Sequence, residues 1–199
     1  MCFMIEGESS NTKSKAKSWL YKYPDATKKL LDMLTNIIID YFVGQIEAGA
    51  QMVQLFETLA EYLDKNLFHK YCLPYIKRIS SSVKAKLREK GVATVPMVIF
   101  AKGAHYALEE LSECNYEVIS IDWTVNPELA RKTVGANVTL QGNLDPCALY
   151  APAEELTAVT RKMVTEFGRF RYIANLGHGI YPDMDPEHVK VFIDVVHSL

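Results

Sequence analysis

Long apolar segments are missing from this sequence of 199 residues. A membrane-spanning helix needs ~18 consecutive apolar residues. The apolar stretch at residues 36–44 is shorter and is interrupted by Asp40. The first residues show no basic segment followed by an apolar core, so no signal peptide is predicted. These absences predict a cytoplasmic protein that does not enter a membrane.

Paired cysteines and an excess of one charge are also missing. The sequence has no Cys-x-x-Cys pair and no cysteine spacing typical of a metal site, so we expect buried free thiols in a reducing compartment. The formal net charge is -2, which gives no general attraction to nucleic acid. The four cysteines are Cys2, Cys72, Cys114 and Cys147.

What the sequence does contain is enough apolar material for a core. Hydrophobic residues make up 49% of the chain, which is sufficient for one domain spanning residues 1–199. Short apolar segments alternate with longer segments of helical periodicity, and no hairpin turn separates them. This pattern predicts right-handed βαβ units on a parallel sheet. The expected strands are residues 1–5, 52–56, 96–100, 116–121, 138–141 and 172–176. The expected helices are residues 14–23, 25–48, 62–66, 67–90, 104–113, 127–134, 152–167 and the segment from 186 onward.

Two of the helical segments have faces of distinct character. Asp25 is expected to cap the long helix that ends near Gly49. A basic face on the helix over residues 67–90 is interpreted as a solvated surface, because no aromatic residues alternate with its cations. The expected buried stripe of the long helix is Leu30, Leu31, Leu34, Ile37, Ile38 and Tyr41. The basic face consists of Lys84, Lys86, Arg88 and Lys90.

Five parallel strands are compatible with two architectures, an open doubly wound sheet or part of a barrel. No Gly-x-Gly-x-x-Gly motif follows any expected strand, and no P-loop is present. The dinucleotide-binding version of the doubly wound sheet therefore lacks its motif. Periodicity alone leaves both architectures open.

The loop after the last expected strand holds the strongest functional candidate, His178. Gly177 and Gly179 flank it, and we expect them to free the backbone and hold the imidazole at the carboxyl end of the strand. Ligands and catalytic groups of α/β proteins lie at that end. A histidine there can transfer a proton near neutral pH or hydrogen-bond a carboxylate. A structural histidine in a glycine turn is the alternative.

A metal site in the same loop is the other possibility to weigh. His178, Asp183, Asp185 and His188 are four possible ligands within eleven residues. They form neither a histidine pair on one helix face nor a set of spaced thiolates. Asp183 and Asp185 lie beside prolines and are interpreted as turn and capping residues. No metal site is predicted.

The same loop carries a family resemblance. Residues 175–188, Asn-Leu-Gly-His-Gly-Ile-Tyr-Pro-Asp-Met-Asp-Pro-Glu-His, closely resemble the C-terminal signature of the uroporphyrinogen decarboxylase family. Other segments resemble this family in the same order, so the resemblance covers nearly all of the chain. It implies a (β/α)8 barrel, which typically needs ~250 residues. The chain is then expected to form a partial barrel, the C-terminal half, with about five parallel strands and outer helices. The other segments are Gly44-Gln45, Gln54–Glu57, Leu73–Tyr75, Phe100–Lys102, Asp122–Thr124 and Leu140–Tyr150.

The resemblance also implies a reaction and partners. Enzymes of this family remove the four acetate carboxyls of uroporphyrinogen III as CO2 to give coproporphyrinogen III, in heme biosynthesis and without a cofactor or metal. The protein must hold a multiply charged tetrapyrrole and stabilise a pyrrole cation by preorganised electrostatics. The family supplies an aspartate and arginines for this from the first half of the barrel. The resemblance further implies a homodimer with facing clefts.

Three residues are assigned to the site by the resemblance. His178 is expected to line the substrate cleft, and Thr58 to hydrogen-bond a substrate carboxylate in place of the family's usual serine. A helix-capping role for Thr58 is the alternative. Phe3 replaces a tyrosine and lacks its phenol oxygen, so a role as a core aromatic is favoured for it.

Two hypotheses remain. The chain is a uroporphyrinogen decarboxylase, or it is a catalytically inactive homologue that binds a tetrapyrrole or interacts with another protein. The missing phenol at Phe3 favours the second hypothesis, and the intact loop around His178 favours the first.

Overall fold

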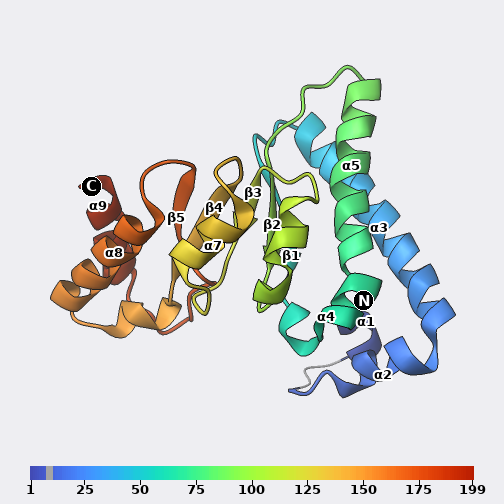
Figure 1. Cartoon of the computed structure of the whole chain (residues 1–199), viewed down its shortest axis with the longest axis horizontal. Helices are drawn as coiled ribbons and strands as arrows, with labels where there is room; N and C mark the ends of the chain where they lie inside the picture. Colours follow the sequence, from blue (N-terminus) through green and yellow to red (C-terminus); the bar gives the residue numbers. More distant parts are fainter. Residues whose placement is uncertain (8–10) are drawn as a thin grey trace.

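Five parallel strands form one sheet in the computed structural model, which describes residues 1–7 and 11–199 (Figure 1). The strands lie side by side in the order in which they occur along the chain. Consecutive βα units of a barrel produce this order. The prediction of a partial barrel with five parallel strands is confirmed, and the sheet is not closed among the described residues. The strands are β1 (Val53–Glu57), β2 (Met97–Ala101), β3 (Val118–Ser120), β4 (Thr139–Leu144) and β5 (Tyr172–Leu176).

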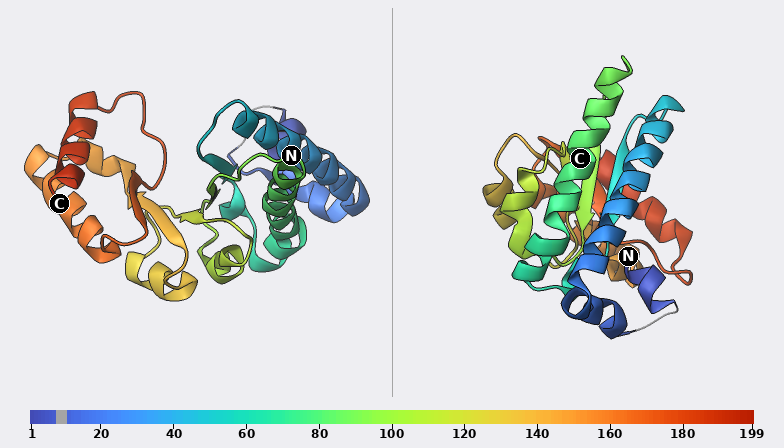
Figure 2. Two further views of the ribbon diagram at one scale, coloured as in Figure 1. Left: turned by 90° about the horizontal axis from the view of Figure 1, so that it is seen from above. Right: turned by 90° about the vertical axis from the view of Figure 1, so that its right-hand side faces the viewer.

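The helices lie outside the sheet (Figures 1 and 2). Helix α3 packs on α5 at one end of the molecule, and α8 packs on α9 at the other. No helix in the described part of the chain is long and apolar enough to cross a membrane. The helices are α1 (Cys2–Glu6), α2 (Ser14–Lys22), α3 (Pro24–Glu47), α4 (Lys65–Tyr71), α5 (Leu73–Glu89), α6 (Leu108–Ser112), α7 (Pro127–Val134), α8 (Ala153–Phe167) and α9 (Pro186–His197). Three short 3₁₀ helices are η1 (Ala60–Tyr62), η2 (His105–Ala107) and η3 (Pro146–Tyr150).

The expected strand at residues 1–5 is wrong, because this segment forms helix α1. The backbone N–H groups of Met4 and Ile5 donate to the carbonyl of Met1, and Gly7 donates to the carbonyl of Phe3. A short apolar run does not distinguish a strand from a helix. Since no strand pairs with the outer side of β1, this strand forms an open edge of the sheet among the described residues.

The long helix α3 buries a different stripe from the expected one. Ile37 is 57% exposed and Tyr41 is 64% exposed, so both were wrongly placed in the core. The expected cap is also wrong, because Tyr23 occupies the N-cap position and no side chain caps it. When apolar residues cover much of the circumference of a helix, their pattern does not determine which side of the helix packs inward. The buried residues of α3 are Thr27, Thr35, Ile39, Phe42, Val43 and Ile46.

The basic face of α5 is only partly solvated. Lys84 is buried, where its ammonium group donates to the Asn115 carbonyl at 2.6 Å and pairs with Glu117. Glu117 also accepts the Met97 N–H at 2.9 Å, so this ion pair ties α5 to the start of β2. The solvated interpretation is therefore wrong for Lys84, whose long side chain is buried on its way to the acceptors of Asn115 and Glu117.

The four free cysteines differ in burial. Cys114 is buried as expected, whereas Cys147 is exposed at the turn into η3. Burial raises the pKa of the Cys114 thiol to about 11, which keeps it protonated near neutral pH.

The core lies between the sheet and the helices. Apolar residues of the central strands, among them Ile99, Ile119 and Leu140, are almost completely buried there. Tyr116 reaches into this core and donates its hydroxyl to the Ile76 carbonyl of α5 at 2.9 Å. Burial raises the pKa of Tyr116 far above its usual range, so the hydroxyl stays protonated and keeps donating.

Replacing this tyrosine tests the link between α5 and the sheet. We expect Tyr116→Phe to lower the free energy of unfolding by about 1 kcal/mol, because a buried hydrogen bond is lost while the ring is kept. Urea denaturation followed by circular dichroism measures it. The control is Tyr41→Phe on the exposed side of α3, which should leave the midpoint unchanged. Equal midpoints for both variants would contradict the assigned contact.

Candidate functional site

The carboxyl ends of the five strands meet at one edge of the sheet, because all strands run parallel. Polar residues lie close to several of the strand ends at this edge. Thr58 follows β1, Lys102 follows β2, and His178 lies two residues beyond β5. This is the edge at which α/β proteins build their sites. The structure therefore places both Thr58 and His178 at the expected edge.

An aromatic row joins four of these strand ends, those of β1, β2, β3 and β5. Phe56 of β1 contacts Phe100 of β2 edge to face, with ring centroids 6.2 Å apart. The His178 imidazole lies 6.5 Å from the Phe100 ring and 6.2 Å from the Trp123 ring, again edge to face. The His178 side chain is otherwise exposed. Its imidazole is therefore positioned by aromatic rings and remains accessible to a ligand.

The carboxylate of Asp122 fixes the loops around this row. Asp122 is 3% exposed, and its Oδ2 accepts the Gly103 N–H at 2.7 Å while Oδ1 accepts the Thr124 N–H at 2.9 Å. The Asn143 side-chain amide donates to the carbonyls of Asp122 and Val125, each at 2.8 Å. The loops after β2 and β3 and the end of β4 are thus held together around the residue that precedes Trp123.

Gly177 brings the fifth strand into this arrangement. A Cβ added at Gly177 would lie 2.5 Å from the backbone nitrogen of Trp123, so only glycine permits this approach. A Cβ added at Gly179 would meet no atom within 4 Å. Neither glycine has a positive φ. The expectation that both glycines free the backbone is therefore wrong: Gly177 permits close packing, and Gly179 has no steric requirement.

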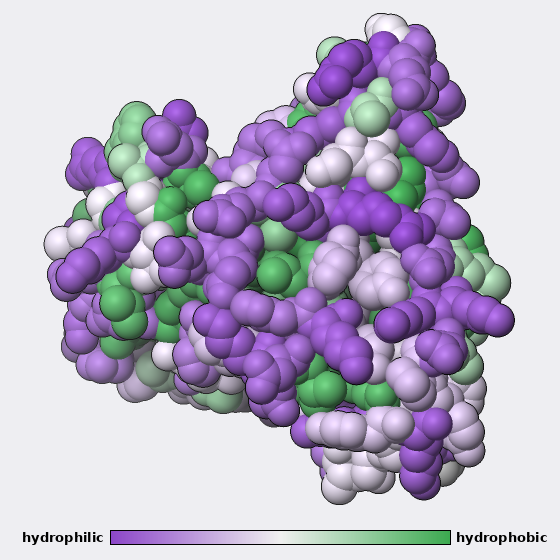
Figure 3. All heavy atoms as spheres, turned by 45° about the vertical axis from the view of Figure 1, so that its right-hand side comes forward, coloured by the Kyte–Doolittle hydropathy of each residue, from purple (hydrophilic) through white to green (hydrophobic). Residues whose placement is uncertain are grey.

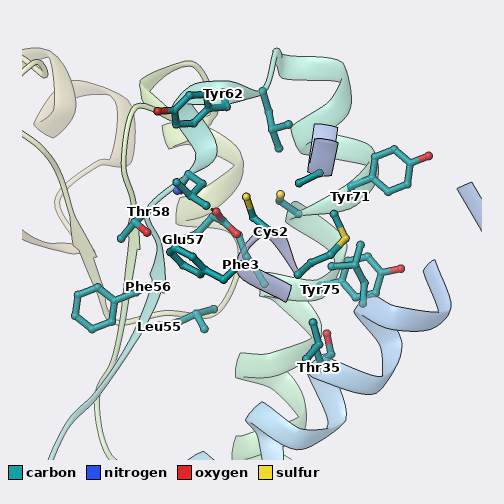
Figure 4. Close-up of a pocket in the computed structure, with 18 of the residues that line it drawn as sticks. Cys2, Phe3, Thr35, Leu55, Phe56, Glu57, Thr58, Tyr62, Tyr71 and Tyr75 are labelled. Atoms are coloured by element: carbon teal, nitrogen blue, oxygen red, sulfur yellow. Dashed lines mark hydrogen bonds between the residues drawn. The ribbon is translucent and has the colours of Figure 1, made fainter. Parts of the chain in front are cut away.

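Thr58 and Phe3 both line a cavity of about 270 Å³ between β1 and the N-terminal helices (Figure 4). Figure 4 shows Phe56 and Thr58 on one side of β1 and Glu57 on the other, toward Phe3 and Cys2. Thr58 thus shares its side of the strand with the aromatic row. His178 does not line the cavity. The structure brings Thr58 near Phe56 but separates Phe3 from His178.

The alternatives considered for these two residues do not match the structure. Phe3 is 73% exposed, so the interpretation as a core aromatic is wrong. Thr58 does not occupy an N-cap position, because Leu59 precedes η1 and Asp64 caps α4. The capping interpretation of Thr58 is therefore also wrong, and its hydroxyl is not committed to a helix terminus.

Two titratable groups that line the cavity, Glu57 and Cys72, are affected by burial. Burial raises the pKa of the Glu57 carboxyl, an effect that the hydrogen bond from the Leu59 N–H at 3.2 Å partly opposes. Burial also raises the pKa of the Cys72 thiol well above its usual value. Burial therefore disfavours the charged forms of both groups, and the charged side chains of Lys13 and Lys17 also line the cavity.

The four possible metal ligands around His178 point to separate partners. Asp183 accepts the Tyr150 hydroxyl at 2.8 Å, and Asp185 caps α9 by accepting the Glu187 N–H at 2.9 Å, as predicted for a capping residue. The His188 ring bonds to the Leu149 carbonyl at 2.6 Å. Across residues 1–7 and 11–199, no cluster of three or more histidine, cysteine or acidic side chains is arranged to hold a metal.

Sequence reasoning missed several residues of this edge. Phe56, Phe100, Trp123 and Lys102 were noticed only as parts of family-like segments. In β1 the burial alternates, and Phe56 occupies an exposed position in an otherwise apolar strand. An aromatic residue at the last exposed position of a strand was the available signal.

Comparison with known proteins places the chain in context. The family model described as "Uroporphyrinogen decarboxylase (URO-D)" matches residues 1–199. Uroporphyrinogen decarboxylase from Homo sapiens is 57% identical over 198 residues, which covers 100% of this chain and 54% of the human protein. The enzyme from Salinibacter ruber is 49% identical, again over 100% of this chain and 54% of the relative. The chain therefore spans about half the length of these relatives.

A solved structure shows the same fold. A methyltransferase from Methanosarcina mazei matches with a TM-score of 0.79 over 93% of this chain and 53% of that chain. The sequences are only 19% identical, so this likeness concerns the fold alone.

The two glycines around His178 give a matched test of the loop. We expect Gly177→Ala to lower the free energy of unfolding by about 1–3 kcal/mol, because the new methyl group overlaps the Trp123 backbone. Gly179→Ala is the control and should change stability by less than about 0.5 kcal/mol, since its surroundings are open. Urea denaturation measures both. Similar losses for the two variants would show that the loop does not pack on Trp123 as described.

Proposed function

The chain belongs to the uroporphyrinogen decarboxylase family, and we propose that its strand-end face binds uroporphyrinogen and takes part in releasing acetate carboxyls as CO2. The proposal treats residues 1–199 as one uroporphyrinogen decarboxylase-like domain. The observation that carries it is the exposed His178 imidazole, which lies against Phe100 and Trp123 at the carboxyl end of the sheet. This geometry supports a hydrogen-bonding or proton-transferring group beside an apolar surface.

The reaction balances without a cofactor. In each step the bond between the acetate methylene and its carboxylate breaks, CO2 leaves, and the methylene carbon takes a proton to become a methyl group. The pyrrole ring, once protonated at carbon, holds the electron pair of the breaking bond. The protein's task is to orient the carboxylate and stabilise the cationic ring.

Named side chains fit parts of this task. The His178 imidazole can donate a hydrogen bond to a carboxylate, and the Thr58 hydroxyl can donate a second one from the end of β1. Phe56 and Trp123 offer ring edges and faces to a macrocycle of pyrroles, whereas Phe100 is buried and supports the row. We propose that these residues bind the tetrapyrrole and that His178 also acts in proton transfer.

A second candidate function is tetrapyrrole binding without turnover. Phe3 has no phenol oxygen, and it lies on the opposite side of β1 from the aromatic row. The resemblance implies that the aspartate and arginines of the reaction come from the first half of the family's barrel. Residues 1–199 resemble the other half. These observations favour binding over catalysis for residues 1–199 on their own.

An activity assay separates the two functions. We expect the purified 199-residue chain, given uroporphyrinogen without oxygen, to form negligible coproporphyrinogen. Loss of even one preorganised electrostatic group lowers rates by ~10²–10³. Chromatography of the oxidised products measures conversion, and Phe3→Tyr is run beside the unmodified chain. Robust conversion by the unmodified chain would contradict the binding-only function.

Tetrapyrrole binding is tested separately. Titration with uroporphyrin, the oxidised macrocycle, should quench the intrinsic fluorescence of the chain. We expect His178→Ala to weaken binding by roughly tenfold, the order of one hydrogen bond to a charged group. The control is His197→Ala, which changes an exposed histidine at the end of α9. Equal affinity of both variants would remove His178 from the proposed site.

We also propose that the chain associates, either with a second copy of itself as a homodimer or with a different partner chain. β1 and β5 each have an outer side without a strand partner among the described residues. Phe56, at the β1 edge, is 64% exposed. Figure 3 shows hydrophobic atoms at several places on the surface between hydrophilic ones. Open strand edges and exposed apolar groups both promote association.

Sedimentation velocity at micromolar concentration measures this. We expect species larger than a monomer for the unmodified chain and a shift toward monomer for Phe56→Lys, which places a charge at the open edge. Tyr21→Lys is a matched control, because Tyr21 on α2 is also 64% exposed. A monodisperse monomer of the unmodified chain would contradict the proposal.

A further inference from the structure

Lys102 is a cationic residue next to the aromatic row of Phe56, Phe100, Trp123 and His178. It follows the last residue of β2, and its ammonium nitrogen lies 2.8 Å from the Glu61 Oε1. The same nitrogen lies over the Trp123 ring, 5.7 Å from its centroid. The Trp123 ring in turn contacts the His178 imidazole. One indole ring therefore connects an ammonium group and an imidazole at the site.

Close packing of two loops determines where this ion pair lies. Gly103 has a φ of 73°, and a Cβ added there would lie 2.5 Å from the Cβ of Glu61. Only glycine allows η1 to approach the loop after β2 so closely. The Gly103 N–H is also bound by the buried Asp122 carboxylate. The backbone beside Lys102 is thus fixed on both sides.

The two partners of the ion pair differ in exposure. The Lys102 side chain is 20% exposed, and that of Glu61 is 39% exposed. Glu61 presents a carboxylate to Lys102 at the edge where the proposed substrate would present its own. Partly exposed ion pairs contribute little net free energy, so a carboxylate ligand can replace Glu61 at small cost.

We propose that Lys102 binds an acetate or propionate carboxylate of the tetrapyrrole and that Glu61 is the internal carboxylate that the substrate displaces. This inference rests on the proposed function and adds a binding residue to it. In the ligand-free state Glu61 holds the ammonium group over Trp123. When substrate binds, Glu61 turns toward solvent and the substrate carboxylate takes its place. Lys102 and His178 then bind carboxylates on two sides of the Trp123 ring.

A purely structural role for the ion pair makes a different prediction. If Lys102 and Glu61 only clamp η1 to the loop after β2, removing either partner should weaken binding alike. If Glu61 competes with substrate, removing it should strengthen binding, because the ammonium group is free and one negative charge near a polyanion is gone. If removing Lys102 weakens binding while removing Glu61 strengthens it, the substrate carboxylate replaces Glu61 on Lys102.

Fluorescence titration of the full 199-residue chain with uroporphyrin tests the inference. We expect Lys102→Met to weaken binding by roughly tenfold, the order of one charge-assisted hydrogen bond. Methionine keeps an unbranched apolar stem against Trp123. Lys102→Arg should retain binding within about threefold, since the charge and donors remain. Glu61→Gln should tighten binding by about threefold, and added salt should reduce this difference.

A second ion pair provides matched controls. Lys90, directly after α5, and Glu47 of α3 lie 2.7 Å apart, at helix ends and away from the carboxyl ends of the strands. Lys90→Met and Glu47→Gln should leave uroporphyrin affinity unchanged. Thermal unfolding of every variant shows whether the fold is retained.

The outcomes separate this inference from the proposed function. If uroporphyrin binds but Lys102→Met has no effect, or if Glu61→Gln weakens binding as Lys102→Met does, the role of Lys102 is overturned and the proposed function stands. If the unmodified chain does not bind uroporphyrin, the proposed function and the role of Lys102 are both overturned.

Discussion

The buried carboxylate of Asp122 is the constraint on which the strand-end face depends. Parallel strands end with backbone groups that have no further strand partner, and each following loop must satisfy them or expose them to water. Asp122 provides acceptors for the loop after β2, through Gly103, and for its own loop, through Thr124. Its carbonyl accepts from Asn143 after the Gly142 position of β4. One residue thereby sets the positions of two loops and of the end of β4.

A buried carboxylate is costly unless hydrogen bonds compensate it, and here several do. These hydrogen bonds require the backbones of neighbouring loops to approach one another closely. Glycine occurs at the positions where they do. Gly103 allows η1 to pack against the loop after β2, and Gly177 allows the loop after β5 to pack against Trp123. The rings of Trp123 and His178 meet because these two approaches hold their backbones in place. The positions of the rings in the aromatic row thus depend on these polar contacts of the backbone.

The sequence predicted the regular part of this structure well. Apolar strand-length segments identified the five strands, with β5 found at residues 172–176, and their alternation with helices identified the parallel sheet. Residues 1–5 were misassigned, because five apolar residues carry no decisive period. The burial of Lys84 depends on Glu117, which is distant in sequence. Of the candidate site, the sequence indicated only that His178 and Thr58 lie at strand ends, since the contacts among Phe100, Trp123 and His178 arise from loop packing.

The alternating directions of the side chains along β1 determine which of the residues assigned by the resemblance can contact one ligand. Successive side chains of a strand point to opposite faces, so Phe56 and Thr58 share one side and Glu57 takes the other, as Figure 4 shows. Phe56 belongs to the aromatic row that reaches His178 through Phe100. A ligand on that row can therefore meet Thr58 and His178 without crossing the strand. Phe3 lies toward Glu57, whose carboxyl pKa is raised by burial. We therefore expect a ligand that meets both Thr58 and His178 to lie along the aromatic row, on the side of β1 that carries Phe56 and Thr58.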